Sequence, residues 1–119
     1  MTTINIFRHD SQVESFAAGE AVITAGEAGE TMYVVVSGKV EIVINGAVID
    51  TVGEGGVVGE MALIDGNSRS ATAVAKTDCT LAPIDRKRFA FLVQQTPYFA
   101  LQVMQVLADR LRRTNAALV

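Results

Sequence analysis

One carboxylate and one guanidinium stand in the segment GEMALIDGNSRSATA, which runs from Gly59 to Ala73. Glu60 lies near its start and Arg69 near its end, and most residues around them are small or apolar. An unpaired charge in an apolar setting is very costly, so each of these side chains needs a partner. The sequence offers two solutions: an internal ion pair between Glu60 and Arg69, or a bound ligand with complementary groups.

The order of residues in this segment favours an anion at Arg69 and hydroxyl groups at Glu60. A turn followed by Met61-Ala62-Leu63-Ile64 predicts a short helix, whose first amides have no internal partner and attract an anion. Arg69 can return to the same point and hold phosphate oxygens through two N–H groups, and Ser70 adds a hydroxyl donor. Glu60 is suited to sugar hydroxyls, as an acidic residue is for the ribose in dinucleotide folds. Together these residues predict a nucleotide pocket.

Short β-type runs separated by glycines must position these residues. Between Val13 and about Asp85, β-branched stretches recur at Ala21–Thr24, Met32–Val36, Val40–Ile44, Ala47–Val52, Ala71–Ala75 and Cys79–Ile84. Asn45-Gly46 between two of them predicts a two-residue hairpin, since a type I′ turn needs positive φ at both positions. Many short strands with glycine-rich corners indicate an antiparallel barrel or jelly roll.

From about Asp85 onward the pattern is helical. Asp85 can cap a helix that ends near Thr96-Pro97, and Pro97 suits the first turn of a second helix reaching roughly Ala116. The second helix carries an apolar stripe at helical spacing, formed by Leu101, Met104, Val106, Leu107, Leu111 and Leu118. Packing of the stripe on the barrel is the simpler interpretation, and a dimer seam or a movable lid is the alternative.

Composition narrows the function classes. The 119 residues are 50% hydrophobic, which predicts a single domain over residues 1–119 with a sizeable core. A single cysteine, Cys79, excludes an intrachain disulfide and fits a cytoplasmic location. The net charge of −3 gives no field for nucleic acid or anionic lipid, and no apolar run approaches the length of a membrane span.

Enzyme chemistry lacks the residues it needs. A cupin-type metal enzyme shares the jelly-roll architecture but requires several histidines, and the chain has only His9, which we expect at the surface. The glycine-rich segments GEAGETM and GEGGVVGE lack the Lys-Ser/Thr of a P-loop. Catalysis of the Ser/His/Asp or Cys/His type lacks a suitable base. We therefore expect no enzyme activity, no cofactor and no metal.

The segment GEMALIDGNSRSATA resembles the phosphate-binding cassette of the cyclic nucleotide-binding domain family, Gly-Glu-x-Ala-Leu followed by Arg-x-Ala-Thr. Upstream, FAAGEAVITAGEAGETMYVVVSGKVEI is similar to the first strands of that family, and the likeness extends from about Phe16 to Asn115. The sequence departs from the family pattern at Ser68, where proline is common, and at Val58, where an aromatic residue is common. The resemblance implies a mainly β fold: an eight-stranded antiparallel β-roll over about 13–85, a short cassette helix, and helices B and C over about 85–117.

The resemblance also implies a role for residues of the cassette. Glu60 would contact the ribose 2′-hydroxyl, and Arg69 and Ser70 would hold the cyclic phosphate. Backbone amides near Met61 and Ala62 would complete the phosphate site. Gly59 would permit a tight approach of the ligand to the backbone.

Outside the cassette the implied contacts are to the base. Ile42 and Ile49 would form an apolar wall beside it. Arg110 would stack over the purine as a lid, with Arg112 or Arg113 as substitutes. A set of solvated basic residues near a helix terminus is the alternative interpretation of these arginines.

These features predict a non-enzymatic sensor that binds cyclic AMP, or less readily cyclic GMP, and moves its C-terminal helices to regulate a partner or a fused effector. The alternative is a structural or interaction module that binds no cyclic nucleotide, or binds another anion. A protein effector or a second copy could dock on the C-terminal helix. We expect no nucleic-acid contact, because the sequence lacks a helix-turn-helix.

Overall fold

The computed structural model describes residues 3–118, with side chains described as far as Arg113. Its elements, in chain order, are β1 (Glu14–Phe16), β2 (Ala21–Ile23), β3 (Met32–Ser37), β4 (Val40–Ile44), β5 (Ala47–Val52), β6 (Val57–Val58), α1 (Glu60–Asp65), β7 (Thr72–Ala75), β8 (Cys79–Ile84), α2 (Arg86–Gln95) and α3 (Tyr98–Leu118). The predicted antiparallel β-roll with a cassette helix and two C-terminal helices is confirmed. The short strands β1 and β6 were not among the predicted runs.

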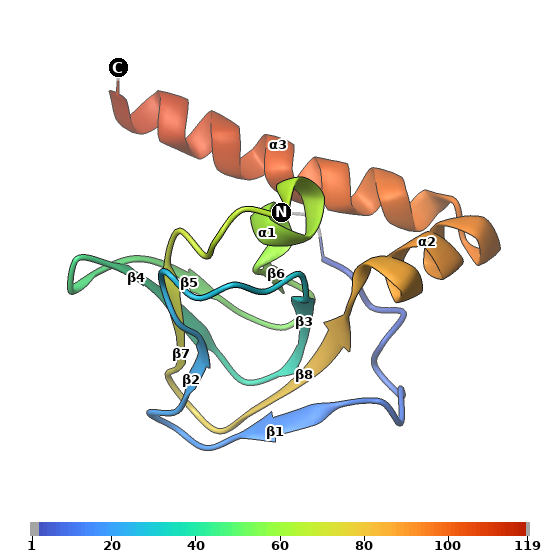
Figure 1. Ribbon diagram of the computed structural model, residues 1–119, viewed down its shortest axis with the longest axis horizontal. Coiled ribbons are helices and arrows are strands. Elements are labelled where there is room, and N and C mark those ends of the chain that lie inside the picture. Colours follow the sequence, from blue (N-terminus) through green and yellow to red (C-terminus); the bar gives the residue numbers. More distant parts are fainter. Residues whose placement is uncertain (1–2, 119) are drawn as a thin grey trace.

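The strands form two four-stranded antiparallel sheets, ordered β1-β8-β3-β6 and β2-β7-β4-β5. Figure 1 shows the roll below α3, with α1 between them and α2 at the side. The hairpin between β4 and β5 turns at Asn45 (φ 51°) and Gly46 (φ 79°). Both residues have the positive φ that the sequence predicted for a type I′ turn.

Two apolar clusters hold the molecule together. One fills the interior of the roll around Val35, Val40 and Leu81. The other lies between the roll and the helices, where the fully buried Phe99 of α3 shares a cluster with Met32 and Ile84. Phe99 thus anchors α3 on the end of the roll, since burying an aromatic side chain of this size is strongly favourable.

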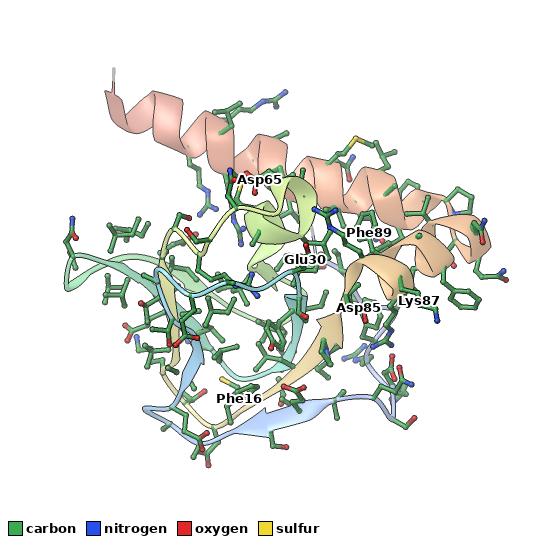
Figure 2. All side chains as sticks on the ribbon, in the orientation of Figure 1. Phe16, Glu30, Asp65, Asp85, Lys87 and Phe89 are labelled. Carbon is green, nitrogen blue, oxygen red and sulfur yellow. The ribbon has the colours of Figure 1, made fainter. Side chains whose placement is uncertain are left out.

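The predicted cap of the first C-terminal helix is confirmed. The Asp85 side chain accepts a hydrogen bond from the backbone N–H of Arg88 at 2.7 Å. Figure 2 shows Phe89 between α2 and α3, where its ring centroid lies 5.4 Å from that of Phe99. This aromatic contact packs α2 against the start of α3.

The predicted apolar stripe of α3 is only partly correct. Val106 is buried, but Leu101, Met104 and Leu111 are 43%, 57% and 62% exposed. The buried face instead contains Phe99 and Val103 with Val106. These three positions follow the i, i+4, i+7 spacing of one helix face, whereas the exposed leucines and Met104 lie on another. The side chain of Leu118 lies outside the described residues.

Neither the 21-residue α3 nor any other helix within residues 3–118 combines the length and hydropathy that a bilayer span requires. Cys79 is buried and His9 is exposed, as expected for the histidine.

A glycine between β3 and β4 gives a test of how tightly the roll is closed. Gly38 has φ +89°, and a Cβ there would overlap the carbonyl oxygen of Asp78. Gly19 has a similar φ of +92°, but nothing lies within 4 Å of its Cβ position. We expect Gly38→Ala to lower the free energy of unfolding by about 2–4 kcal/mol, and Gly19→Ala by only about 1–2 kcal/mol. Urea unfolding of both variants measures the difference, and equal losses would contradict the overlap.

Candidate functional site

A cavity of about 570 Å³ lies between α1, α3 and the sheet that contains β4, β5 and β7. All nine residues predicted for a ligand site line it: Ile42, Ile49, Gly59, Glu60, Met61, Ala62, Arg69, Ser70 and Arg110. Arg113 also lines it, whereas Arg112 is exposed and does not. The volume falls in the range of small-molecule sites.

The cassette helix α1 starts and ends at glycines in the left-handed conformation. Gly59 has φ 78° at the N-terminal end, and Gly66 has φ 72° at the C-terminal end. A Cβ at Gly59 would lie 2.9 Å from Nη1 of Arg69. Glycine at position 59 is therefore needed both for the backbone turn and for the close approach of the guanidinium.

Arg69 is held by backbone carbonyls. Its Nη2 donates to the carbonyl of Thr31 at 2.6 Å, and its Nη1 donates to the carbonyl of Gly59 at 3.1 Å. In the part of the chain that the structure describes, no carboxylate forms an ion pair with Arg69. The internal Glu60–Arg69 ion pair considered from the sequence is therefore wrong for this structure. Among the residues that the structure describes, the guanidinium thus has hydrogen-bond acceptors but no carboxylate in an ion pair with it.

The backbone around Arg69 is also fixed. The N–H of Arg69 donates to the carbonyl of Glu27 at 2.9 Å, and the carbonyl of Arg69 accepts from Gly26 at 2.8 Å. These two bonds join the end of the cassette to the loop between β2 and β3. The guanidinium is thereby presented to the cavity from a constrained loop.

Tyr33 on β3 is influenced by the same charge. Burial raises the pKa of Tyr33, the charge of Glu14 acts in the same direction, and the charge of Arg69 acts against both. Tyr33 therefore stays neutral at physiological pH.

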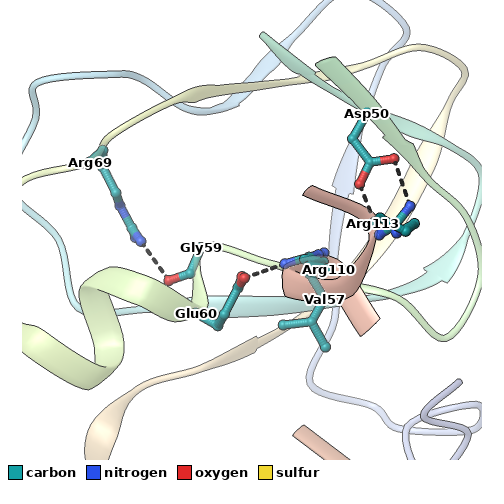
Figure 3. Close-up of polar contacts among 7 residues, drawn as sticks. All are labelled: Asp50, Val57, Gly59, Glu60, Arg69, Arg110 and Arg113. Carbon is teal, nitrogen blue, oxygen red and sulfur yellow. Dashed lines mark hydrogen bonds and ion pairs between the residues drawn. The ribbon is translucent and has the colours of Figure 1, made fainter. Parts of the chain in front are cut away.

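Glu60 is 5% exposed and forms an ion pair with Arg110 of α3. The second nitrogen of that guanidinium, Nη2, donates to the carbonyl of Val57 (Figure 3). Arg110 lines the cavity and contacts Glu60 and Val57, and its role as a lid over the purine stays a prediction. A buried carboxylate needs a nearby cation, and α3 supplies it.

A second ion pair joins α3 to the roll at the cavity edge. Arg113 lies 3.4 Å and 3.5 Å from the two carboxylate oxygens of Asp50 on β5. Ile49, the neighbour of Asp50, is 57% exposed, and Ile42 on β4 is half-buried. These isoleucines give the cavity an apolar wall on the side of the β4–β5 hairpin.

The cassette helix is connected to α2 as well. Arg86, the first residue of α2, donates from Nε to the carbonyl of Leu63 at 3.0 Å. This bond satisfies one of the carbonyls that a helix leaves unpaired at its C-terminal end. A displacement of α1 therefore acts on α2 directly.

Two features of the site were missed from the sequence. The carbonyl of Thr31 as a partner of Arg69 has no residue-type signal. Asp50 did carry a residue-type signal. It is an acidic residue two positions before the buried Val52, so it lies on the same face of β5, because side chains alternate along a strand. No group of three or more His, Cys, Asp or Glu side chains within residues 3–118 is arranged to hold a metal ion.

The sequence profile of the cyclic nucleotide-binding domain matches residues 13–96. The fold is similar to the catabolite activator protein of Thermus thermophilus, with 32% identity and a TM-score of 0.79 over 90% of this chain and 53% of that one. It is also similar to the c-di-GMP-responsive global regulator CLP of Xanthomonas campestris (27% identity, TM-score 0.80, 92% and 58% of the chains). A third similar structure is cAMP-bound PfPKA-R (141–441), with 27% identity and a TM-score of 0.69 over 87% of this chain and 36% of that one. The chain thus spans less than two thirds of each of these proteins.

The contact between Glu60 and Arg110 predicts a large coupling energy. Arg110→Ala leaves a buried carboxylate without its cation, so we expect the free energy of unfolding to fall by about 2–4 kcal/mol. In the Glu60→Gln background the same change should cost about 1 kcal/mol or less, because no buried charge remains. Chemical unfolding of the four proteins in this double-mutant cycle measures the coupling, and additive losses would contradict it.

Proposed function

The chain belongs to the cyclic nucleotide-binding domain family, and we propose that it is a non-enzymatic sensor that binds cyclic AMP, or less readily cyclic GMP. In this proposal residues 1–119 act as one ligand-binding unit. Binding changes the position of the C-terminal helices and so regulates a protein partner or a fused effector.

The main support for the proposal is the environment of the Arg69 guanidinium. Its guanidinium lines the cavity, is held by the carbonyls of Gly59 and Thr31, and forms no ion pair with a described carboxylate. A partly buried cation of this kind is stabilised by an anion that enters the cavity. A cyclic phosphate has the charge and the oxygen atoms that such a guanidinium can bind.

The remaining lining residues suit the other parts of a cyclic nucleotide. Ser70 and the first amides of α1 add donors for phosphate oxygens. Glu60 is an acceptor for the ribose 2′-hydroxyl. Ile42 and Ile49 offer an apolar surface to the base.

Ligand binding would be communicated to the helices through Glu60 and α1. The carboxylate that would accept the ribose hydroxyl is also the one that holds Arg110 of α3. At the other end of α1, the carbonyl of Leu63 accepts from Arg86 of α2. A ligand that differs in affinity between two arrangements of α1 therefore shifts α2 and α3 together.

The exposed face of α3 is the surface that we propose for a partner. Leu101, Met104 and Leu111 lie on it and are each more than 40% exposed. Apolar side chains at such helical spacing suit either a protein effector or a second copy of the chain.

Replacement of Arg69 tests the proposed phosphate contact. We expect Arg69→Ala to weaken cyclic AMP binding by about 3 kcal/mol or more, because the phosphate loses a charge-assisted partner. Arg69→Lys should also lose affinity, since a point charge cannot reproduce two parallel N–H donors. Calorimetric titration measures both effects, with thermal unfolding as a check that each variant is folded.

Arg8→Ala is the matched control, because Arg8 is an exposed arginine that does not line the cavity. Unchanged affinity in both Arg69 variants would contradict the phosphate role. A folded parent protein that binds neither cyclic AMP nor cyclic GMP would favour the alternative, a structural or interaction module.

Removal of the ribose 2′-hydroxyl tests Glu60. We expect 2′-deoxy cyclic AMP to bind the parent about tenfold more weakly than cyclic AMP, because one hydrogen bond to a carboxylate is lost. In Glu60→Gln the difference between the two ligands should shrink to about threefold or less. Equal affinity of the parent for both ligands would exclude a contact between Glu60 and that hydroxyl.

A further inference from the structure

Asp50 is a second carboxylate on the cavity wall, and the contacts assigned above to phosphate and ribose leave it unused. It lies on β5, its side chain is 28% exposed, and it lines the cavity together with Arg113. Figure 3 shows Arg69 and the Asp50–Arg113 pair on opposite sides of Glu60. A ligand that extends from Arg69 past Glu60 therefore points its far end toward Asp50.

The present partner of Asp50 is weakly held. The distances of 3.4 Å and 3.5 Å to Arg113 are at the outer limit for hydrogen bonds. The Arg113 side chain is 49% exposed, and ion pairs so open to water contribute little to stability. A ligand group can therefore share or take over the Asp50 carboxylate at small cost.

One of the two Asp50 oxygens is already engaged within its own strand. Oδ1 accepts a hydrogen bond from the N–H of Thr51 at 2.9 Å. Oδ2 has no such backbone bond among those described, so it is the oxygen better placed to accept from a ligand. This arrangement suits one donor rather than a side-by-side pair of donors.

We propose that Asp50 selects adenine over guanine by accepting a hydrogen bond from the 6-amino group of the base. The proposal rests on the proposed function, because phosphate at Arg69 and ribose at Glu60 direct the base toward Asp50.

Adenine and guanine present opposite hydrogen-bonding groups, a donor and an acceptor, at the position that faces Asp50. A carboxylate only accepts hydrogen bonds. Adenine has a donor amine at C6, whereas guanine has an acceptor carbonyl there, which would meet the carboxylate with like partial charges. The donor edge of guanine, N1–H and N2–H₂, fits a carboxylate best through both oxygens, and Oδ1 is already bonded to Thr51. Mismatch at a polar contact of this kind discriminates more strongly than a difference in apolar shape.

The test compares three ligands: cyclic AMP, cyclic GMP, and the 3′,5′-cyclic monophosphate of purine riboside, which lacks the 6-amino group. Calorimetry gives the affinity of each for the parent and for Asp50→Ala. We expect the substitution to weaken cyclic AMP about tenfold, and to change the other two ligands by about threefold or less. The preference of the parent for cyclic AMP over the ligand that lacks the 6-amino group should then nearly disappear in the variant.

Two control variants separate base reading from other roles of Asp50. Glu41→Ala removes a carboxylate from β4 opposite Thr51, on the same hairpin but off the cavity wall, and should leave all three affinities unchanged. Arg113→Ala removes the ion pair to α3 while keeping Asp50. If Asp50→Ala and Arg113→Ala weaken all three ligands equally, Asp50 only anchors α3 and the assignment is overturned.

A selective loss of cyclic GMP in Asp50→Ala would also overturn it, because Asp50 would then contact guanine. If Asp50→Ala binds the three ligands with the same ratio of affinities as the parent, this assignment is overturned but the proposed function is not. Absence of binding by the parent to all three ligands would overturn the proposed function, and this assignment with it.

Discussion

A buried carboxylate is costly without a compensating charge, and at Glu60 this constraint ties α3 to the roll. Glu60 is 5% exposed, and its cation comes from Arg110, 50 residues later in the chain. The same guanidinium donates to Val57, so one side chain joins β6, the start of α1 and the middle of α3. Any movement of α3 that withdraws Arg110 must be accompanied by another partner for Glu60. The position of the helix and the occupancy of the cavity are therefore linked by electrostatics as well as by packing.

The two charges of the cassette are satisfied in different ways. Glu60 has a cation, whereas Arg69 has carbonyl acceptors that meet its hydrogen-bonding needs without neutralising its charge. The backbone hydrogen bonds that join Arg69 to Gly26 and Glu27 fix the loop that carries this guanidinium. An anion entering the cavity would meet a cation that is already oriented, so little ordering cost would remain.

The sequence was informative wherever a structural feature depends on neighbouring residues. The Asn45-Gly46 turn, the Asp85 cap and the short helix after Gly59 are local features with known residue preferences. Glu60, Arg69 and Ser70 were predicted from residue type and order, whereas Ile42, Ile49 and Arg110 followed only from the resemblance to a family. Two contacts, Arg69 with the Thr31 carbonyl and Glu60 with Arg110, join positions 38 and 50 residues apart. A backbone carbonyl has no residue-type signature, and several arginines near the end of α3 were equally plausible, so these contacts needed the fold.

The pairing of β1 with β8 bears on how the chain folds as it leaves the ribosome. Glu14 lies opposite Leu81 in the register, so the first strand gains its neighbour only after most of the roll has been synthesised. The apolar end of the roll, which includes Met32 and Ile84, is covered later still, when Phe99 and Val103 emerge. Such non-local contacts require costly loop closure and slow folding. Until then the nascent chain carries unpaired strand edges and exposed apolar surface, the features that make folding intermediates prone to aggregate and dependent on chaperones.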